Sequence, residues 1–198
     1  MMSTSPQLIA DIRDAQDGDA RAEARVVDVA LPLVLGWCAS LGGPTVDFED
    51  AAHDALEVVL GRLDSLEDPA AFRSWLFGIT RRTLAKHRRR AWVRRWVPGM
   101  DLSRAEDPGH SPQTQAELSE MSQSVQTALA ALPEAQREVL VLCDLEERSD
   151  SEAAQILGVP KGTIKSRLRL GRKRFRTELE RMGASAALDP LPHPGSTL

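Results

Sequence analysis

The chain has 198 residues, of which 42% are hydrophobic and only 4% aromatic, and its formal net charge is −4. This length fits one ordinary domain or two small ones, and the apolar fraction suffices for a packed core, which argues against wholesale disorder. No long uncharged apolar run occurs, and the first ten residues lack a basic start and an apolar stretch. We therefore expect no membrane insertion and no signal peptide, and place the protein in the cytoplasm.

The net charge conceals a strong segregation of charge along the chain. Residues 1–72 hold four basic and fourteen acidic side chains, whereas residues 73–97 hold nine basic side chains and no acid. Residues 161–181 hold nine more basic side chains against two acids. Because a solvated helix face usually mixes both signs, two basic blocks in an acidic protein favour two contacts with a polyanion over two merely solvated faces.

The hydrophobic pattern is helical nearly throughout, which predicts an all-α fold of two small helical domains joined by a flexible linker. The first domain is expected over 8–97 and the second over 119–182. The segment 98–118 is polar and rich in Pro, Gly and Ser, so it reads as a linker that does not require the domains to touch. The Pro-containing tail over 183–198 is expected to be disordered.

In the first domain, a mixed pattern over 47–63 predicts a helix with an acidic exposed surface. Its expected buried residues are Ala51, Ala55, Val58 and Val59. A second helix is expected to start at Phe72, shortly after Pro69, and to run through the basic block to Trp96. Trp92 and Trp96 lie about one helical turn apart, and we expect both to be packing residues.

In the second domain, Pro133 suits the start of a helix, and Ser149 with Glu152 fits a capping box that starts another. The turn at Gly158 then leads into a basic helix over 161–181. This spacing predicts a helix-turn-helix. In the last helix, a stripe of cations lies beside a buried apolar stripe, so the cations can face phosphates and base edges in a major groove. The cations of this stripe are Lys165, Arg169, Arg172 and Arg176, and the apolar residues are Ile164, Leu168, Phe175 and Leu179.

Four segments carry a resemblance to a known family. Residues 132–140 (LPEAQREVL) and 154–168 (AQILGVPKGTIKSRL) resemble region 4 of extracytoplasmic-function sigma factors, and residues 47–50 (DFED) and 72–79 (FRSWLFGI) resemble region 2. The order, the spacing and the intervening linker agree as well. The resemblance implies a sigma factor that binds core RNA polymerase and directs promoter recognition, melting and transcription initiation.

The resemblance also implies roles position by position. The last helix would read the −35 element through Lys161, Thr163, Lys165, Ser166, Arg169, Arg172 and Lys173. The helix from Phe72 would recognise and melt the −10 element through Phe72, Trp75, Arg81, Arg82, Lys86 and Arg89, although for Trp75 the residues favour a place in the core. The acidic helix would dock on the polymerase β′ coiled coil through Asp47, Asp50 and Asp54, and region 4 would touch the β flap. Promoter DNA is the second partner, and the family admits an anti-sigma factor as a third.

Two other readings remain open. A stand-alone helix-turn-helix regulator would explain the second domain, but it leaves the Trp75 segment and the basic block after it without a role. An enzyme is the other alternative, because His53 and Asp54 could form half of a metal-dependent phosphohydrolase dyad. The remaining histidines are not placed to complete such a site, so we expect no catalytic residue, no metal and no cofactor.

Two further expectations concern the cysteines and the free protein. Cys38 and Cys143 lie far apart in apolar helical contexts without a CxxC motif, so we expect two buried thiols rather than a zinc site. We also expect the free protein to bind DNA weakly and with a steep salt dependence, because its acidic segments can compete with DNA for the basic blocks.

Overall fold

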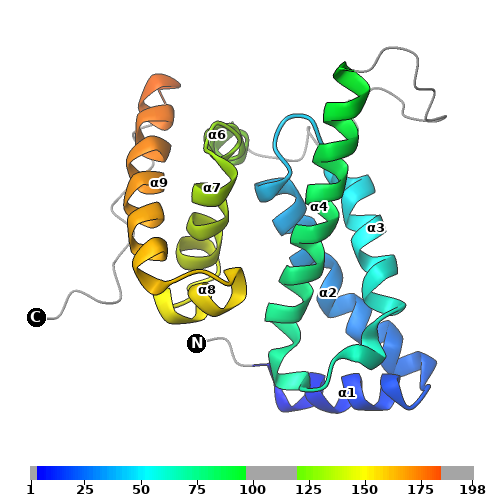
Figure 1. Cartoon of the computed structure of the whole chain (residues 1–198). Coiled ribbons are helices and arrows are strands. Elements are labelled where there is room, and N and C mark those ends of the chain that lie inside the picture. The colour runs from blue at the N-terminus through cyan, green and yellow to red at the C-terminus, as the bar shows by residue number, and fades with distance from the viewer. Residues whose placement is uncertain (1–3, 97–119, 184–198) are drawn as a thin grey trace, which may run out of the picture.

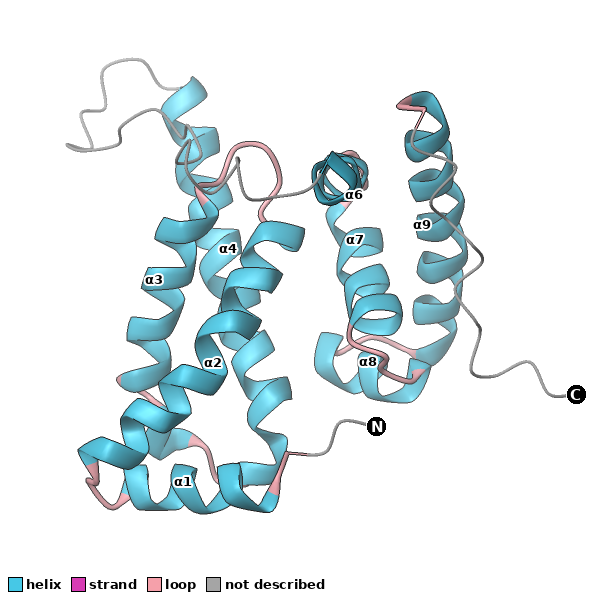
Figure 2. Cartoon of the chain, turned by 180° about the vertical axis from the view of Figure 1, so that it is seen from behind, coloured by secondary structure: helices cyan, strands magenta, loops and turns pink. Residues whose placement is uncertain are grey.

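The computed structural model describes residues 4–96 and 120–183, and every regular element in these two ranges is helical, which confirms the all-α prediction. The helices form two groups that stand side by side (Figures 1 and 2). The helices are α1 (Pro6–Gln16), α2 (Ala20–Leu41), α3 (Phe48–Leu60), α4 (Phe72–Trp96), α6 (Glu120–Ala130), α7 (Glu134–Leu140), α8 (Asp150–Leu157) and α9 (Lys161–Arg181). Short helical turns occur at η1 (Leu63–Ser65), η2 (Pro69–Ala71) and η3 (Val141–Leu145). The predicted linker over 98–118 and the predicted tail beyond Gly183 lie outside the described residues.

The first domain is a bundle of α2, α3 and α4, with α1 lying across one end (Figure 1). Among the described helices, α2 alone is long and apolar enough to be considered as a membrane span. One stripe of α2, however, is buried in the bundle and forms a large part of its core. The buried residues of this stripe are Ala22, Val26, Ala30, Val34, Trp37, Cys38 and Leu41. We therefore interpret α2 as the core helix of the first domain.

Helix α3 begins where the acidic pattern begins, because the carboxylate of Asp47 accepts hydrogen bonds from the backbone amides of Glu49 and Asp50 at 3.0 and 3.1 Å. Ala51, Ala55 and Val59 are buried as predicted. The prediction for Val58 is wrong, since this side chain is 37% exposed. At about 100° per residue, the buried stripe is centred between Ala55 and Val59 and takes in Ala52, so Val58 falls at its edge.

Helix α4 has the predicted bounds, and the carboxylate of Asp68 caps the preceding turn η2 by accepting from the amide of Ala70 at 2.9 Å. The prediction that Trp92 packs is wrong, because its side chain is 62% exposed. Figure 1 shows the reason: the last turns of α4 project beyond the ends of α2 and α3, so no neighbouring helix lies beside them. The side chain of Trp96 lies outside the described residues.

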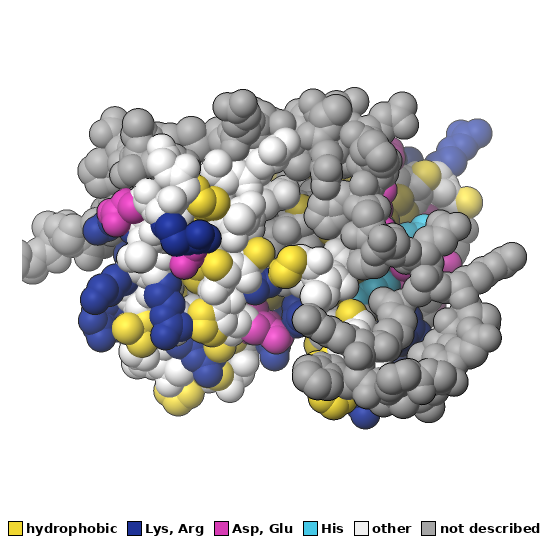
Figure 3. Space-filling model, turned by 90° about the horizontal axis from the view of Figure 1, so that it is seen from above, with side chains coloured by type: hydrophobic (Ala, Val, Ile, Leu, Met, Phe, Trp, Pro, Cys, Tyr) yellow, Lys and Arg dark blue, Asp and Glu magenta, His cyan; other side chains and the backbone are white. Residues whose placement is uncertain are grey.

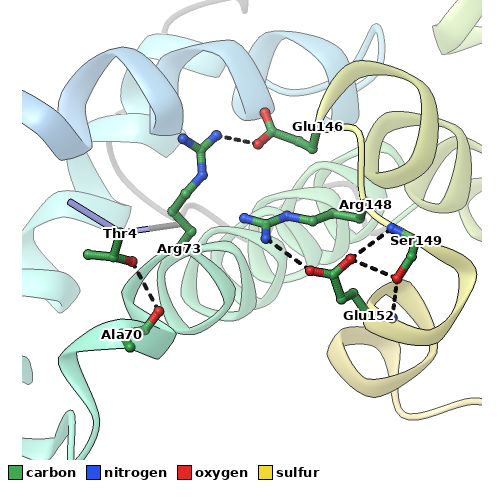
Figure 4. Close-up of polar contacts among 7 residues, drawn as sticks. All are labelled: Thr4, Ala70, Arg73, Glu146, Arg148, Ser149 and Glu152. Carbon is green, nitrogen blue, oxygen red and sulfur yellow. Dashed lines mark hydrogen bonds and ion pairs between the residues drawn. The ribbon is translucent and has the colours of Figure 1, made fainter. Parts of the chain in front are cut away.

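In the second domain, α8 and α9 form the predicted helix-turn-helix. The Ser149 hydroxyl accepts from the Glu152 amide at 3.3 Å, and the Glu152 carboxylate accepts from the Ser149 amide at 2.9 Å, so the predicted capping box is confirmed (Figure 4). Gly158 ends α8 with a φ of +66°, a conformation that glycine adopts without the strain other residues incur. Inside the domain, Ile164, Leu168 and Leu179 of α9 are buried.

The two domains touch, although the sequence did not require it. A single hydrophobic cluster takes in Trp37 and Phe77 of the first domain together with Val139 and Leu142 of the second. Within it, the Trp37 and Phe77 rings meet edge to face at 5.2 Å. Helix α7 thereby occupies the face formed by α2 and α4, while α9 lies on the far side of α7 (Figure 1).

Candidate nucleic-acid interfaces

The outer face of α9 carries most of the side chains predicted to contact the −35 element. Because Ile164 and Leu168 hold the inner face against the core, the polar residues of the same turns point to solvent. Figure 3 shows Lys and Arg side chains gathering on the side of the molecule where α9 lies. The exposed residues are Lys161, Lys165, Ser166, Arg169 and Lys173, and Thr163 is half-buried. A cationic, solvent-facing second helix is what insertion into a major groove requires.

Arg172 differs from the other predicted contacts of α9. Its guanidinium binds the carboxylate of Asp144 in η3 through two hydrogen bonds of 2.5 and 3.0 Å, and this bonding raises the pKa of Arg172. The Asp144 side chain is only 10% exposed. On the helix, Arg172 lies about 80° from Ile164, close enough to the buried stripe to reach back into the domain. The structure thus places Arg172 in an ion pair that joins α9 to η3.

On α4, the six residues predicted to contact the −10 element separate into three groups. Phe72 is fully buried, so its ring belongs to the core and not to a surface. Trp75 is half-buried and packs against the same core, with its ring 6.2 Å from that of Phe72, which agrees with the core reading of this residue. Arg82, Lys86 and Arg89 are exposed and lie on one face of α4. Arg81 is half-buried and paired with the second domain.

A second set of α4 cations faces the other domain. The guanidinium of Arg73 contacts Glu146 at 2.5 Å (Figure 4), that of Arg81 contacts Glu138 at 2.9 Å, and Arg88 contacts Glu134. The Trp37 indole also donates to Glu146, at 2.9 Å. Sequence reasoning assigned no role to these glutamates. The available signal was the spacing of the three arginines by eight and seven residues, which places them on one side of a helix.

The acidic residues of α3 that were predicted to contact polymerase are not equivalent. Asp47 is half-buried and engaged in capping α3, whereas Asp50 is exposed. Asp54 is half-buried, with its Oδ2 atom 2.9 Å from Nε2 of His87 and 3.7 Å from the Arg90 guanidinium. Of the three, Asp50 presents the carboxylate that is most accessible to a partner.

Neither the histidines nor the cysteines form a metal site among the described residues. His53 lies beside Glu57 at 3.3 Å on the exposed face of α3, and no group of three or more potential ligands occurs in this part of the chain. Cys38 is buried and Cys143 half-buried, and both are free thiols. Burial raises the pKa of Cys38 to about 12 and that of Cys143 to about 11, which disfavours the reactive thiolate at neutral pH.

Two family models match the chain, one in each domain. Residues 26–94 match sigma-70 region 2, and residues 122–175 match sigma-70 region 4. The first match spans parts of α2 and α4 and the whole of α3 between them. The second contains α8, the turn after it and most of α9. The exposed cations that were predicted to contact DNA therefore fall within the two matched regions: Arg82, Lys86 and Arg89 on α4, and Lys161, Lys165, Arg169 and Lys173 on α9.

Curated relatives and solved structures agree with these matches. The chain is 28% identical over 176 residues to the ECF RNA polymerase sigma factor SigW of Bacillus subtilis, covering 85% of this chain and 94% of that protein. It is 31% identical over 183 residues to the ECF RNA polymerase sigma factor RpoE of Cereibacter sphaeroides, covering 87% of this chain and 93% of that protein. The structure of the sigma factor RpoE in complex with the anti-sigma factor NepR from Bartonella quintana matches with a TM-score of 0.63 at 28% identity, over 81% of this chain and 98% of that chain.

Proposed function

Because this chain belongs to the extracytoplasmic-function (ECF) sigma factors of bacterial RNA polymerase, we propose that α9 binds the −35 element and that the exposed face of α4 binds the −10 element. The observation that carries this proposal is the presence of two separate cationic helix faces in one chain, one of them on the second helix of a helix-turn-helix. Bound to core polymerase, the protein directs promoter recognition and melting. It contributes no catalytic step of its own.

The −35 contact rests on the exposed part of the predicted set. Lys165, Arg169 and Lys173 recur at spacings of four residues along the solvent side of α9, and Ser166 lies beside them. Lysine and arginine contact phosphates, and arginine can also bond the edge of guanine in a bidentate manner. Arg172 supports this surface indirectly, because its pair with Asp144 fixes α9 against η3.

The −10 contact uses a different part of the molecule. Arg82, Lys86 and Arg89 provide positive charge along the outer side of α4. Trp92, exposed at the end of the same helix, supplies an aromatic surface of the kind on which unstacked bases lie. Melting a duplex requires both cations for the displaced backbone and a surface for unpaired bases, and α4 offers both.

Core polymerase and a regulatory protein complete the set of partners. The accessible carboxylate of Asp50 on α3 faces the polymerase β′ coiled coil, and region 4 faces the β flap. The Bartonella quintana RpoE protein, which resembles this chain, was solved in complex with an anti-sigma factor. An anti-sigma factor is accordingly a partner class for this chain, and we place the protein in the cytoplasm with the polymerase.

Run-off transcription tests the proposed function. Purified core polymerase from a matched species transcribes bacterial genomic fragments with and without this protein. New transcripts that share a pair of upstream motifs are expected with the protein present. The absence of new transcripts, together with failure to co-elute with core polymerase, would overturn the proposal and favour a stand-alone regulator.

A further inference from the structure

Leu170 is an apolar side chain on the outer face of α9. It is 38% exposed, and no other large hydrophobic side chain is as exposed on this helix, every residue of which the structure describes. Three of its neighbours one helical turn away, Ser166, Lys173 and Arg174, are polar and exposed. The leucine is thus an apolar point in a surface that is largely polar and cationic.

The geometry of α9 directs Leu170 away from the core of the second domain. Leu168 is buried, and at about 100° per residue Leu170 lies about 160° around the helix from it. Ser166, which was predicted to contact the −35 element, lies only about 40° from Leu170, and Lys173 lies about 60° from it. Leu170 therefore belongs to the same solvent-facing side as these predicted contacts, near the middle of the helix.

The surroundings of Leu170 distinguish it from an ordinary surface leucine. Single exposed leucines are common on proteins and by themselves indicate no site. Leu170, however, lies on the second helix of a helix-turn-helix, among the side chains proposed to contact DNA. Helix α9 also lies on the far side of α7 from the first domain, so no described helix of that domain covers this face (Figure 1). An apolar contact in a complex with DNA would remove the leucine from water, which is favourable.

The chemistry of the major groove indicates what a leucine at this place can recognise. Arginine and lysine bind the acceptor atoms of guanine, and serine can bond to several bases. Thymine differs from the other bases by its C5-methyl group, which takes an apolar contact in place of a hydrogen bond. The exposed side chains proposed to contact the −35 element all end in polar groups, whereas the isobutyl group of Leu170 is apolar throughout.

We propose that Leu170 is a specificity-determining residue of the −35 contact, and that it selects thymine at one position of that element by packing against the C5-methyl group. This inference rests on the proposed function, because it assigns a base preference to the face of α9 that is proposed to bind the −35 element. The contact removes apolar surface of both partners from water. Removing the thymine methyl group should therefore weaken binding about fourfold, the loss that corresponds to one buried methyl group.

Selection of DNA by the holoenzyme tests the proposal. Core polymerase from a matched species is combined with the full-length protein and binds a library of duplexes that contain a random block of base pairs, with core polymerase alone as the background. The wild type should enrich an upstream motif with thymine at one position. A duplex of the selected sequence is then made with deoxyuridine at that position, which removes the methyl group and keeps the base pair. We expect the wild-type holoenzyme to bind this duplex about fourfold more weakly than the thymine duplex.

Three variants assign the thymine preference to the leucine side chain. Leu170→Ala removes the apolar contact from the protein side, so it should bind the thymine and deoxyuridine duplexes equally well. Leu170→Met keeps an apolar side chain of similar volume and should still prefer thymine. Leu145→Ala truncates another exposed leucine of the second domain, in η3 and outside α9, and should keep the wild-type preference. Circular dichroism confirms the helical content of each variant.

The proposal is overturned if the wild-type holoenzyme enriches an upstream motif in which deoxyuridine weakens binding at no position, or if folded Leu170→Ala still prefers thymine to deoxyuridine. Either result leaves the proposed function standing, because enrichment of the motif already demonstrates recognition of the −35 element. If the wild type enriches no motif above the background of core polymerase, the proposed −35 contact fails, and the role of Leu170 fails with it.

Discussion

The guanidinium of Arg137 in α7 donates a hydrogen bond of 2.8 Å to the carbonyl oxygen of Leu41, the last residue of α2. The same guanidinium donates at 2.9 Å to the carbonyls of Ala130 and Leu132, at the end of α6. Helix ends leave carbonyls without intrahelical partners, and a cation there also complements the helix dipole. The Arg137 side chain thus caps carbonyls at helix ends in both domains. Burial of this guanidinium lowers the pKa of Arg137.

Replacing Arg137 by alanine should lower the free energy of unfolding by about 2–4 kcal/mol. The carbonyls of Ala130 and Leu132 lose this donor in a buried place, and that of Leu41 keeps only its hydrogen bond of 3.1 Å from Arg88. Urea unfolding followed by circular dichroism measures the change. Arg174→Ala is the matched control, since Arg174 is exposed and makes, within the described residues, one side-chain hydrogen bond, to Gln136 at 3.2 Å. An equal loss in both variants would contradict a special role for Arg137.

Gly43, the second of the two glycines after α2, leaves room for the guanidinium of Arg137 beside the backbone. Gly43 has a φ of +77°, and a Cβ atom built on it would lie 2.9 Å from Nη1 of Arg137. Because three carbonyls hold that guanidinium, it cannot move away freely. We expect Gly43→Ala to destabilise the protein by about 1–2 kcal/mol. Gly36→Ala, inside α2 and with no atom within 4 Å of the new Cβ, should stabilise it by about 0.5–1 kcal/mol. Thermal unfolding of the two variants should therefore shift in opposite directions.

The features that sequence predicted best are those that depend on near neighbours in the chain. The capping box of Ser149 and Glu152, the helix start after Pro133 and the turn at Gly158 each involve groups within a few residues of one another. The alternation of apolar and polar residues likewise predicted most of the buried faces of α3 and α9. Local physical chemistry decides these features, so the structure confirmed them.

The features that sequence missed depend on contacts between distant segments. In the sequence, Arg81 and Arg172 resemble the other cations of the two basic stripes. Nothing near them in the sequence shows that Arg81 pairs with Glu138 and Arg172 with Asp144. Trp92 has a large apolar side chain of the kind that usually packs in a core, but no helix lies beside the projecting end of α4. Assigning such residues requires knowing which helix faces which, and helical periodicity alone does not give that.

We expect the stability of the protein to depend on pH because the pKa of Glu138 is raised in the folded state. Burial, its largest influence, raises the pKa of Glu138 although Arg81 acts in the opposite direction. A carboxyl with a raised pKa binds its proton more tightly in the folded than in the unfolded state. Its contribution to stability is therefore largest below the ordinary glutamate pKa, and it declines as the pH rises through the raised value.

Substituting Gln for Glu138 should remove that decline, because glutamine stays neutral. Relative to the wild type, Glu138→Gln should gain stability between weakly acidic and neutral pH in urea unfolding. Glu134→Gln is the control, since the Glu134 side chain is 51% exposed. A constant difference between wild type and Glu138→Gln across this pH range would contradict the assignment.

Asp50 and Asp54 should respond differently to charge reversal. Asp50→Lys should weaken binding to core polymerase with little loss of stability, because Asp50 is exposed and forms no ion pair among the described contacts. Asp54→Lys places a cation beside His87 and Arg90, so it should lower the unfolding temperature as well. Co-elution with core polymerase and thermal unfolding measure the two effects. Asp14→Lys on α1, an exposed residue outside α3, serves as the control and should change neither.

Arg169 and Arg172 provide the sharpest comparison on α9, since both are basic and three residues apart. Arg169→Ala should reduce −35-dependent transcription by about tenfold or more at unchanged stability, because an exposed cation that contacts a base or phosphate contributes about 1–3 kcal/mol to binding. Arg172→Ala should lower the free energy of unfolding by about 1–3 kcal/mol, because it leaves the carboxylate of Asp144 buried without its partner.

A double-mutant cycle separates the two roles. Asp144→Ala and Arg172→Ala remove two halves of one pair, so the double variant should lose less stability than the sum of the single losses. Arg169→Ala combined with Asp144→Ala should be additive, since no contact joins these residues among those described. Additive losses for Arg172 and Asp144 would mean that the ion pair does not stabilise α9, and Arg172 would then return to the set of candidate DNA contacts.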